Sequence, residues 1–199
     1  MVPITSPFCH CCSEPFPGGY PSFICTSCKE RRFSFLCAVS AYRFRGAVRD
    51  VIHRIKYHSD YGLRVQAGRW LVRTLRDPRM RTPQPDLLIP VPLHSLRRRE
   101  RGFNQAEAIA EWVSHRCRIP CIRALVRIKN TATQTGFDRK KRISNLRGAF
   151  ILHHNRDVLA KHCVLVDDVF TTGSTLDACA RVLRAAGAAS IRCITVARG

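Results

Sequence analysis

The chain has 199 residues, of which 45% are hydrophobic and 24% charged, a composition typical of one globular α/β domain with a small appendage. It has no run of about 18 apolar residues, and its first residues lack the basic and then apolar pattern of a secretory signal. We therefore expect neither membrane insertion nor export, but a cytoplasmic protein whose 11 cysteines stay reduced.

The balance of charge is strongly basic, with 34 Lys and Arg against 14 Asp and Glu and a formal net charge of +20. A field this positive attracts polyanions such as nucleic acid, phosphorylated metabolites or an acidic membrane surface. A basic surface that only faces solvent would have the same composition. Contacts to phosphate groups carry no sequence information, so the charge predicts affinity without specificity.

The first 40 residues are rich in cysteine and loop-forming residues, and we expect residues 1–40 to form a zinc ribbon. Two Cys-x2-Cys pairs, Cys9 with Cys12 and Cys25 with Cys28, can each supply one edge of a tetrahedron, which predicts a structural Zn²⁺ held by four thiolates. Zinc would then stabilise a segment that has too little core of its own. Unliganded cysteines or a redox pair would show the same spacing. The residues that could replace a ligand are Cys11, His10 and Cys37.

Residues 41–199 are expected to form the main domain, which begins with a helical lead-in at about 46–77. Apolar residues recur there at a helical spacing, first around Ile52 and again around Leu71, and Pro78 is expected to end the pattern. We expect the apolar stripes to cover a sheet and the Lys and Arg side chains to face solvent.

From residue 86 onward, short apolar runs alternate with amphipathic segments. This alternation predicts an α/β fold with a doubly wound, mostly parallel sheet and helices on both faces. The cysteines of these segments resemble small buried apolar residues, namely Cys163, Cys179 and Cys193. The expected strands are 86–92, 121–128, 148–152, 162–168 and 190–197, and the expected helices are 103–117 and 174–187.

The stretch VLVDDVFTTGSTL (164–176) combines two of the few carboxylates with a turn rich in hydroxyls. Asp167 and Asp168 fall at the carboxyl end of an apolar strand, where open α/β sheets bind ligands. The turn leads into a helix whose first N–H groups attract an anion, which predicts a phosphate cradle without the spacing of a Walker A loop. The cradle residues are Thr171, Thr172, Gly173, Ser174 and Thr175.

Two carboxylates beside a phosphate cradle make chemical sense if the ligand also carries a sugar and a cation. Carboxylates accept hydrogen bonds from a ribose diol and can hold Mg²⁺, so a 5-phosphorylated ribose would satisfy both halves of the stretch. The structural alternative is an aspartate that caps a helix before a turn rich in Ser and Thr, which fits one carboxylate better than two.

VLVDDVFTTGST closely resembles the signature with which type I phosphoribosyltransferases bind 5-phosphoribosyl-1-pyrophosphate (PRPP), except that Phe170 replaces a smaller aliphatic residue. The cysteine pairs and three further blocks occur in the order seen in the ComF family of competence-associated proteins. The resemblance covers nearly the whole chain and implies a type I phosphoribosyltransferase-like fold with an N-terminal zinc ribbon. The blocks are YRFRGAVRDVIHRIKYHSDYG, IPVPLHSLRRRERGFNQAEAIA and QTGFDRKKRISNLRGAF.

The resemblance also implies roles for single residues. Asp167 and Asp168 would contact the ribose hydroxyls and, as the catalytic candidates, stabilise the positive sugar ring or take a proton, while residues 171–175 would hold the 5-phosphate. The basic loop at 92–101 would bind pyrophosphate through the backbone N–H groups of Leu93 and His94, since Pro92 has none, and through Arg97 and Arg101. As a run of charge, the same loop could bind a nucleic-acid backbone or only face solvent. Asn104 is expected to cap the following helix or orient the loop.

The long polar stretch at 129–148 resembles the flexible loop that closes over PRPP in type I enzymes. Its closure would exclude water, and its basic residues, with Mg²⁺, would neutralise the leaving pyrophosphate. A disordered basic loop is the alternative. The residues concerned are Gln134, Arg139 and Arg142.

The sequence therefore predicts a PRPP-binding phosphoribosyltransferase-like protein in which pyrophosphate leaves C1 of the ribose and an unnamed acceptor adds there. The family's link to natural competence implies a role in handling imported single-stranded DNA, with PRPP, single-stranded DNA or another nucleic acid, and competence proteins as partners. The alternative is a non-catalytic nucleic-acid-binding protein that senses PRPP, which the charge of +20 and the zinc ribbon favour.

Overall fold

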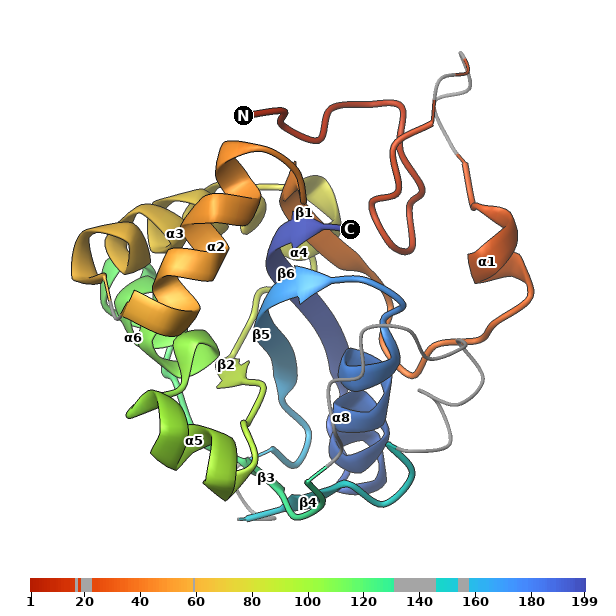
Figure 1. The fold of residues 1–199 in the computed structure, drawn as a ribbon. Helices are drawn as coiled ribbons and strands as arrows, with labels where there is room; N and C mark the ends of the chain where they lie inside the picture. The colour runs from red at the N-terminus through yellow and green to blue at the C-terminus, as the bar shows by residue number, and fades with distance from the viewer. Residues whose placement is uncertain (17, 19–22, 59, 131–145, 154–157) are drawn as a thin grey trace.

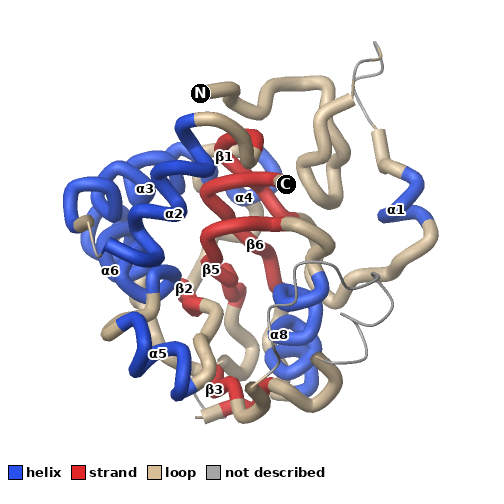
Figure 2. Tube along the Cα trace, in the orientation of Figure 1, coloured by secondary structure: helices blue, strands red, loops and turns tan. Residues whose placement is uncertain are grey.

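The computed structural model describes the chain except for residues 17, 19–22, 59, 131–145 and 154–157. At its centre is a parallel sheet of four strands in the order β1-β6-β5-β2. Helices cover both faces of this sheet (Figures 1 and 2). The predicted α/β fold with a parallel sheet is confirmed. The strands are β1 (Ala38–Arg43), β2 (Leu87–Pro90), β5 (His162–Phe170) and β6 (Ser190–Arg198).

One face of the sheet packs against three helices, α2 (Ala47–His58), α3 (Tyr61–Thr74) and α6 (Gln105–Cys117). Alternate residues of β5, Val164 and Val166, contribute to this core because successive side chains of a strand point to opposite faces. The expected helical lead-in is confirmed as two helices, although Pro78 begins the short helix α4 (Pro78–Arg81) instead of ending α3.

The other face packs against α8 (Ser174–Ala185), which buries Leu176, Cys179 and Leu183 against it. The intervening residues of β5, Cys163 and Leu165, belong to this second core. The predicted burial of Cys163, Cys179 and Cys193 is confirmed.

Two predictions for the middle of the chain are wrong. The basic segment after β2 was expected to be a loop, but residues Ser95–Arg101 form the helix α5, whose first N–H groups are satisfied in part by the His94 side chain. The segment 121–128 was expected to be one strand, but only β3 (Leu125–Arg127) is a strand, and it pairs antiparallel with β4 (Phe150–Leu152) outside the main sheet.

Strand β1 was not predicted, and it lies across the expected division at residue 40. The first residues of the chain pair with its outer edge, where the Ile4 N–H donates to the Ala41 carbonyl at 3.1 Å and the Arg43 N–H to the Val2 carbonyl at 3.0 Å. The division into a ribbon and a main domain stays a prediction, but the N-terminal segment packs directly on the sheet. It contains one short helix, α1 (Thr26–Lys29).

Among the described residues, no helix combines the length and the apolar character needed to span a bilayer.

Gly68 is expected to be essential for the close packing of α3 on α6. A Cβ atom at this position would overlap the ring of Trp112. We predict that Gly68→Ala lowers the free energy of unfolding by roughly 1–3 kcal/mol, although alanine favours helices by about 1 kcal/mol. Urea unfolding measures this change.

Gly62→Ala is the matched control, because a Cβ there meets only the Asp60 Oδ1 atom, at 3.5 Å. Its stability should equal or exceed that of the wild type. Equal stability of both variants would show that the α3–α6 contact does not constrain the fold.

Candidate functional site

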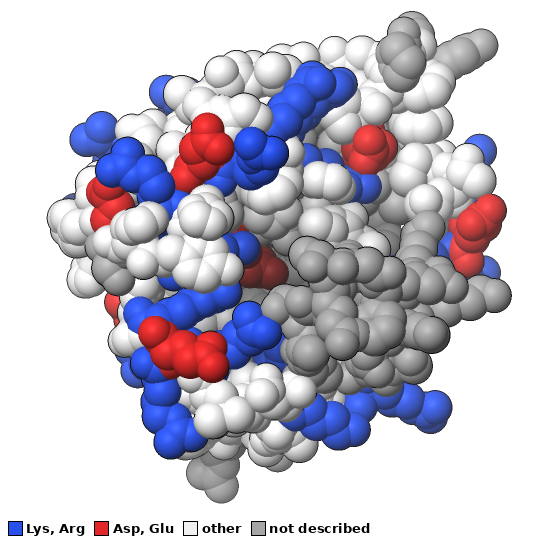
Figure 3. Space-filling model, viewed as in Figure 1, with Lys and Arg blue, Asp and Glu red and all other residues white. Residues whose placement is uncertain are grey.

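Asp167 and Asp168, here called the carboxyl pair, lie near the carboxyl end of the central strand β5, shortly before its final residue Phe170. Asp168 is buried, and one of its carboxylate oxygens lies 2.5 Å from the Lys56 Nζ atom in the last turn of α2. Figure 3, in the view of Figure 1, shows acidic atoms recessed between basic ones near the middle of the face on which β5 ends. A buried carboxylate thus has a cation from a helix that lies more than a hundred residues earlier in the chain.

The two carboxyl groups have opposite protonation preferences. Burial raises the pKa of Asp167 well above its usual range, and the neighbouring Asp168 charge raises it further. Burial also opposes ionisation of Asp168, but the Lys56 ammonium outweighs burial and holds the pKa of Asp168 below its usual range. For Lys56, burial is likewise outweighed by Asp168, and the pKa of Lys56 is raised. The site therefore stabilises one negative charge and leaves the second unfavourable.

The carboxyl groups are also fixed in place by the backbone. The Asp168 N–H donates to Asp167 Oδ1 at 2.9 Å, and the Val169 N–H donates to Asp168 Oδ1 at 3.0 Å. These bonds orient both side chains at the carboxyl end of the sheet. Two oriented carboxyl groups suit the binding of a ligand with several hydroxyl groups.

The predicted cradle, residues 171–175, is here called the phosphate turn. Helix α8 begins within it at Ser174, and its N-cap residue, Gly173, has a φ of 72° and makes no side-chain cap. Glycine is required because of this φ and because a Cβ would lie 2.5 Å from the Phe170 ring and 3.0 Å from Phe33. Thr172 Oγ1 and Ser174 Oγ lie 2.9 Å apart, which gathers two hydroxyls at the start of the helix. The N-terminus of α8 can therefore accept an anion.

Helix α5, which carries the basic residues after β2, lies on the other side of β5 from α8 (Figure 1). Arg101 donates to Gln105 Oε1 at 3.2 Å, and its charge acts on Lys56. Burial lowers the pKa of Arg127 in β3, and the nearby charge of Arg97 lowers it further. Leu93 and the half-buried His94 precede α5, and the His94 ring is engaged as its cap.

The prediction for Asn104 is confirmed. Its Oδ1 accepts from the Ala106 N–H at 3.1 Å, which caps α6, and its Nδ2 donates to the Val91 carbonyl at 3.0 Å, which holds the segment that follows β2. The three residues expected in the closing loop, Gln134, Arg139 and Arg142, lie outside the described residues.

The four predicted cysteines come together. The Sγ atoms of Cys9, Cys12, Cys25 and Cys28 all lie within 4.8 Å of one another, whereas the alternative ligands Cys11, His10 and Cys37 are not in this group. The Cys12 and Cys25 sulfurs are 3.7 Å apart, close to the edge of about 3.8 Å expected for a tetrahedron with Zn–S bonds of about 2.3 Å.

Close packing in this cluster shifts the pKa values of Cys9, Cys12 and Cys28. Hydrogen bonding from Cys12 lowers the pKa of Cys9 to about 4, while the bond with Cys9 and burial raise the pKa of Cys12 and burial raises that of Cys28. Four such sulfurs are a donor set that fits a thiolate-binding metal ion.

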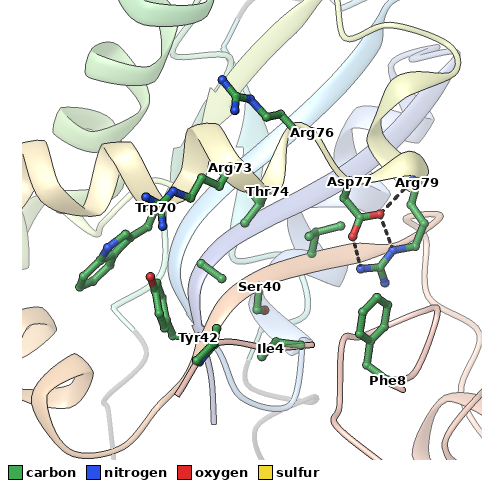
Figure 4. A pocket seen from close by; sticks show the side chains of 13 residues that line it. Ile4, Phe8, Ser40, Tyr42, Trp70, Arg73, Thr74, Arg76, Asp77 and Arg79 are labelled. Carbon is green, nitrogen blue, oxygen red and sulfur yellow. Dashed lines mark hydrogen bonds and ion pairs between the residues drawn. The ribbon is translucent and has the colours of Figure 1, made fainter. Parts of the chain in front are cut away.

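The described part of residues 1–35, here called the cysteine module, docks on the sheet near α4. Arg79 binds both carboxylate oxygens of Asp77 and stacks over the Phe8 ring, with its guanidinium carbon 4.4 Å from the centroid (Figure 4). It also donates to the His10 carbonyl at 3.0 Å. A cavity of about 390 Å³ lies beside this contact, between the module, β1 and α3. It is separate from the carboxyl pair and the phosphate turn.

The comparisons with known proteins agree with this geometry. The sequence model of the phosphoribosyl transferase domain matches residues 98–199. Competence protein F of Haemophilus influenzae is 34% identical over 198 residues, which cover 96% of this chain and 85% of that protein. The chain belongs to the ComF family. The DNA utilization protein YhgH of Salmonella typhi is 32% identical over 181 residues, 88% of this chain and 78% of that protein.

Solved structures are similar to parts of the chain at low identity. The glutamine PRPP amidotransferase of B. subtilis has a TM-score of 0.44 and 20% identity over 66% of this chain and 25% of its own. The adenine phosphoribosyltransferase of Leishmania tarentolae has a TM-score of 0.44 and 12% identity over 73% of this chain and 74% of its own. No residue role is transferred from either.

Sequence reasoning missed two side chains of this ComF site. Lys56 lies in a block typical of the family, but we expected the basic residues of its helix to face solvent, which is wrong for Lys56. Arg31, in the cysteine module, donates to the Thr172 carbonyl at 3.0 Å. Neither contact has a local signal, because each joins segments that are distant in sequence.

The raised pKa of Asp167 predicts a stability that falls with pH. The folded protein keeps a proton on Asp167 that the unfolded chain releases above about pH 4, so this carboxyl destabilises the fold increasingly as pH rises. Asp167→Asn removes this effect. Its free energy of unfolding should rise relative to the wild type as the pH increases above about 4, by up to about 1.4 kcal/mol per pH unit.

Asp168→Asn is the matched control with the opposite sign. The lowered pKa of Asp168 stabilises the fold above about pH 4, and this contribution is lost as pH falls through the folded pKa. The variant should therefore be less stable than the wild type at pH 7 and approach it in acid. Urea unfolding across this range decides, and an Asp167→Asn difference that is constant with pH would contradict the assignment.

Proposed function

We propose that this ComF-family protein binds Mg²⁺ and PRPP at the carboxyl end of β5. The observation that carries the proposal is the order of features along one segment: two fixed carboxyl groups near the end of β5 and, after the short phosphate turn, the N-terminus of α8, whose N-cap residue Gly173 has no side chain. The carboxyl pair would hold the ribose hydroxyls, and the phosphate turn would hold the 5-phosphate through backbone N–H groups and the hydroxyls of Thr172 and Ser174.

The proposed reaction is transfer of the phosphoribosyl group. The bond between C1 and the pyrophosphate oxygen breaks with its electrons on the oxygen, and an acceptor's lone pair forms the new bond to C1. The ionised Asp168 would stabilise the positive charge that develops on the ring. The backbone at Leu93 and His94, with Arg97 and Arg101, would receive the pyrophosphate. Mg²⁺ bound with PRPP would supply further neutralisation of the leaving group.

We also propose a structural zinc ion at the four cysteines. The grouping of the sulfurs and their near-tetrahedral spacing support a closed site, since four thiolates leave no position for substrate. Bound zinc would fix the short helix α1, which begins after Cys25, contains Cys28 and has no buried residue.

The cellular role proposed is the handling of imported single-stranded DNA in the cytoplasm, together with competence proteins. The names of the relatives, competence protein F and DNA utilization protein, support this role. The net charge of +20 supports contact with a nucleic acid, because basic side chains that neutralise phosphates supply most non-specific affinity.

A second candidate is a non-catalytic protein that senses PRPP while bound to nucleic acid. The ion pair between Asp168 and Lys56 favours it, because Lys56 already neutralises one of the two carboxylates that catalysis would use. Both candidates need PRPP to bind, so they differ only in whether the bound PRPP then reacts.

Asp168→Asn should weaken the binding of Mg²⁺ and PRPP by about 10- to 100-fold, the effect of losing charge-assisted hydrogen bonds to the ribose. Isothermal calorimetry measures the affinity. Asp50→Asn, which changes an exposed aspartate of α2, is the matched control and should bind as the wild type does. Undiminished affinity in Asp168→Asn would reject this site for PRPP.

Release of pyrophosphate separates the two candidates. The transferase predicts pyrophosphate release from PRPP that depends on one member of a panel of bases, amines and single-stranded DNA, and that is lost in Asp168→Asn. The sensor predicts tight PRPP binding with no release across the panel.

A further inference from the structure

We propose that Arg31 is a positioning residue of the phosphate turn, supplied by the cysteine module, through which metal binding at the four cysteines strengthens phosphate binding at Ser174. This inference rests on the proposed function of the phosphate turn. It joins two sites that the proposed function treats separately.

Arg31 reaches across from the cysteine module to three groups of the turn and of α8. One guanidinium nitrogen, Nη1, donates to the Thr172 carbonyl at 3.0 Å, and both terminal nitrogens lie 3.4 Å from Ser174 Oγ. Nη2 is also 3.6 Å from the buried Asp177 carboxylate. The Arg31 side chain is only 14% exposed, so these contacts are sheltered from solvent.

The chemistry of a guanidinium determines what these contacts do to Ser174. Arginine only donates, so Ser174 Oγ must accept from it, and the proton of the hydroxyl is then left to donate elsewhere. In the structure it can point to Thr172 Oγ1, 2.9 Å away, and an anion at the start of α8 would offer a stronger acceptor. Arg31 thus orients the hydroxyl as a donor and adds positive charge beside it. A cavity of about 500 Å³, which Arg31 and Ser174 help to line, adjoins the turn.

The position of Arg31 depends on the cysteine cluster. Helix α1 (Thr26–Lys29) begins directly after Cys25 and contains Cys28. It has four residues and buries none of them, so neither its length nor a core can stabilise it. The cluster that includes Cys25 and Cys28 is what holds this turn, and Arg31 follows three residues after Cys28.

The segment after Arg31 continues the contact with α8 and the strand end. The Ser34 N–H donates to Asp177 Oδ1 at 2.7 Å, and the Phe33 and Phe35 rings meet the Phe170 ring edge-on at 6.3 Å. The cysteine cluster and the phosphate turn are therefore ends of one short chain of packed groups. Binding at either end should favour the arrangement that the other needs, and such coupling is reciprocal.

The test uses the full chain, with one zinc per chain confirmed by metal analysis, and ribose 5-phosphate as the probe of the phosphate turn. Isothermal calorimetry should show that Arg31→Ala weakens ribose 5-phosphate binding about tenfold. Magnesium pyrophosphate, proposed to bind at residues 93–101, should change less than twofold. Arg32→Ala, which removes the neighbouring exposed arginine, should match the wild type for both ligands.

Coupling to the metal has a second readout. In the wild type, zinc removal should weaken ribose 5-phosphate binding about tenfold, and ribose 5-phosphate should raise the zinc affinity by the same factor in a chelator competition. In Arg31→Ala, zinc should still bind but neither ligand should affect the other. If Arg31 only stabilised the fold, the Arg31→Ala variant that still binds zinc would keep the coupling between zinc and ribose 5-phosphate.

Two failures can be told apart. If the zinc-loaded wild type does not bind PRPP, the proposed function is wrong and this inference with it. If PRPP binds but Arg31→Ala and Arg32→Ala have equal affinity for ribose 5-phosphate, or if the coupling persists in Arg31→Ala, only the inference is overturned.

Discussion

Two adjacent carboxyl groups at the end of the central strand face a constraint that shapes the rest of the site. Burial disfavours charge on both, and each disfavours charge on the other, so only one can ionise readily. Lys56 makes Asp168 that one, which requires α2 to pack with its last turn over the strand end. Ionising both carboxyl groups is unfavourable in the free protein. A ligand with hydroxyl groups and a cation would suit the pair, because the hydroxyls and the cation would each stabilise the negative charge. The cost in stability and the capacity to bind thus have the same origin.

The phosphate turn depends on a second element that is distant in sequence. Its backbone can lead into α8 with a positive φ only because Gly173 fits against Phe170 and Phe33. Phe33 belongs to the cysteine module, which Arg79 also fixes to the core through Asp77 and the His10 carbonyl. The module is therefore a structural part of the candidate site, and its four-cysteine cluster lies within the same packed unit.

The sequence predicted the elements whose signals are local. The β5 strand, the helices α6 and α8, the Asn104 cap and the grouping of four cysteines follow from apolar periodicity, capping chemistry and ligand spacing within a few residues. It did not predict β1, because that strand takes its identity from pairing with β6 and with the first residues of the chain. The helix α5 was missed since its basic residues bury no apolar face. Lys56 and Arg31 were missed because their partners come from other segments, and only the fold brings them together.

The central claim is that β5 and the turn after it bind PRPP. The most direct measurement is a crystal structure of the zinc-loaded protein with Mg²⁺ and PRPP. It should show the 5-phosphate at the N–H groups of residues 173–175, the ribose hydroxyls on Asp167 and Asp168, and the pyrophosphate toward residues 93–101. A 5-phosphate bound elsewhere, or a ribose that does not touch the two aspartates, would contradict the account.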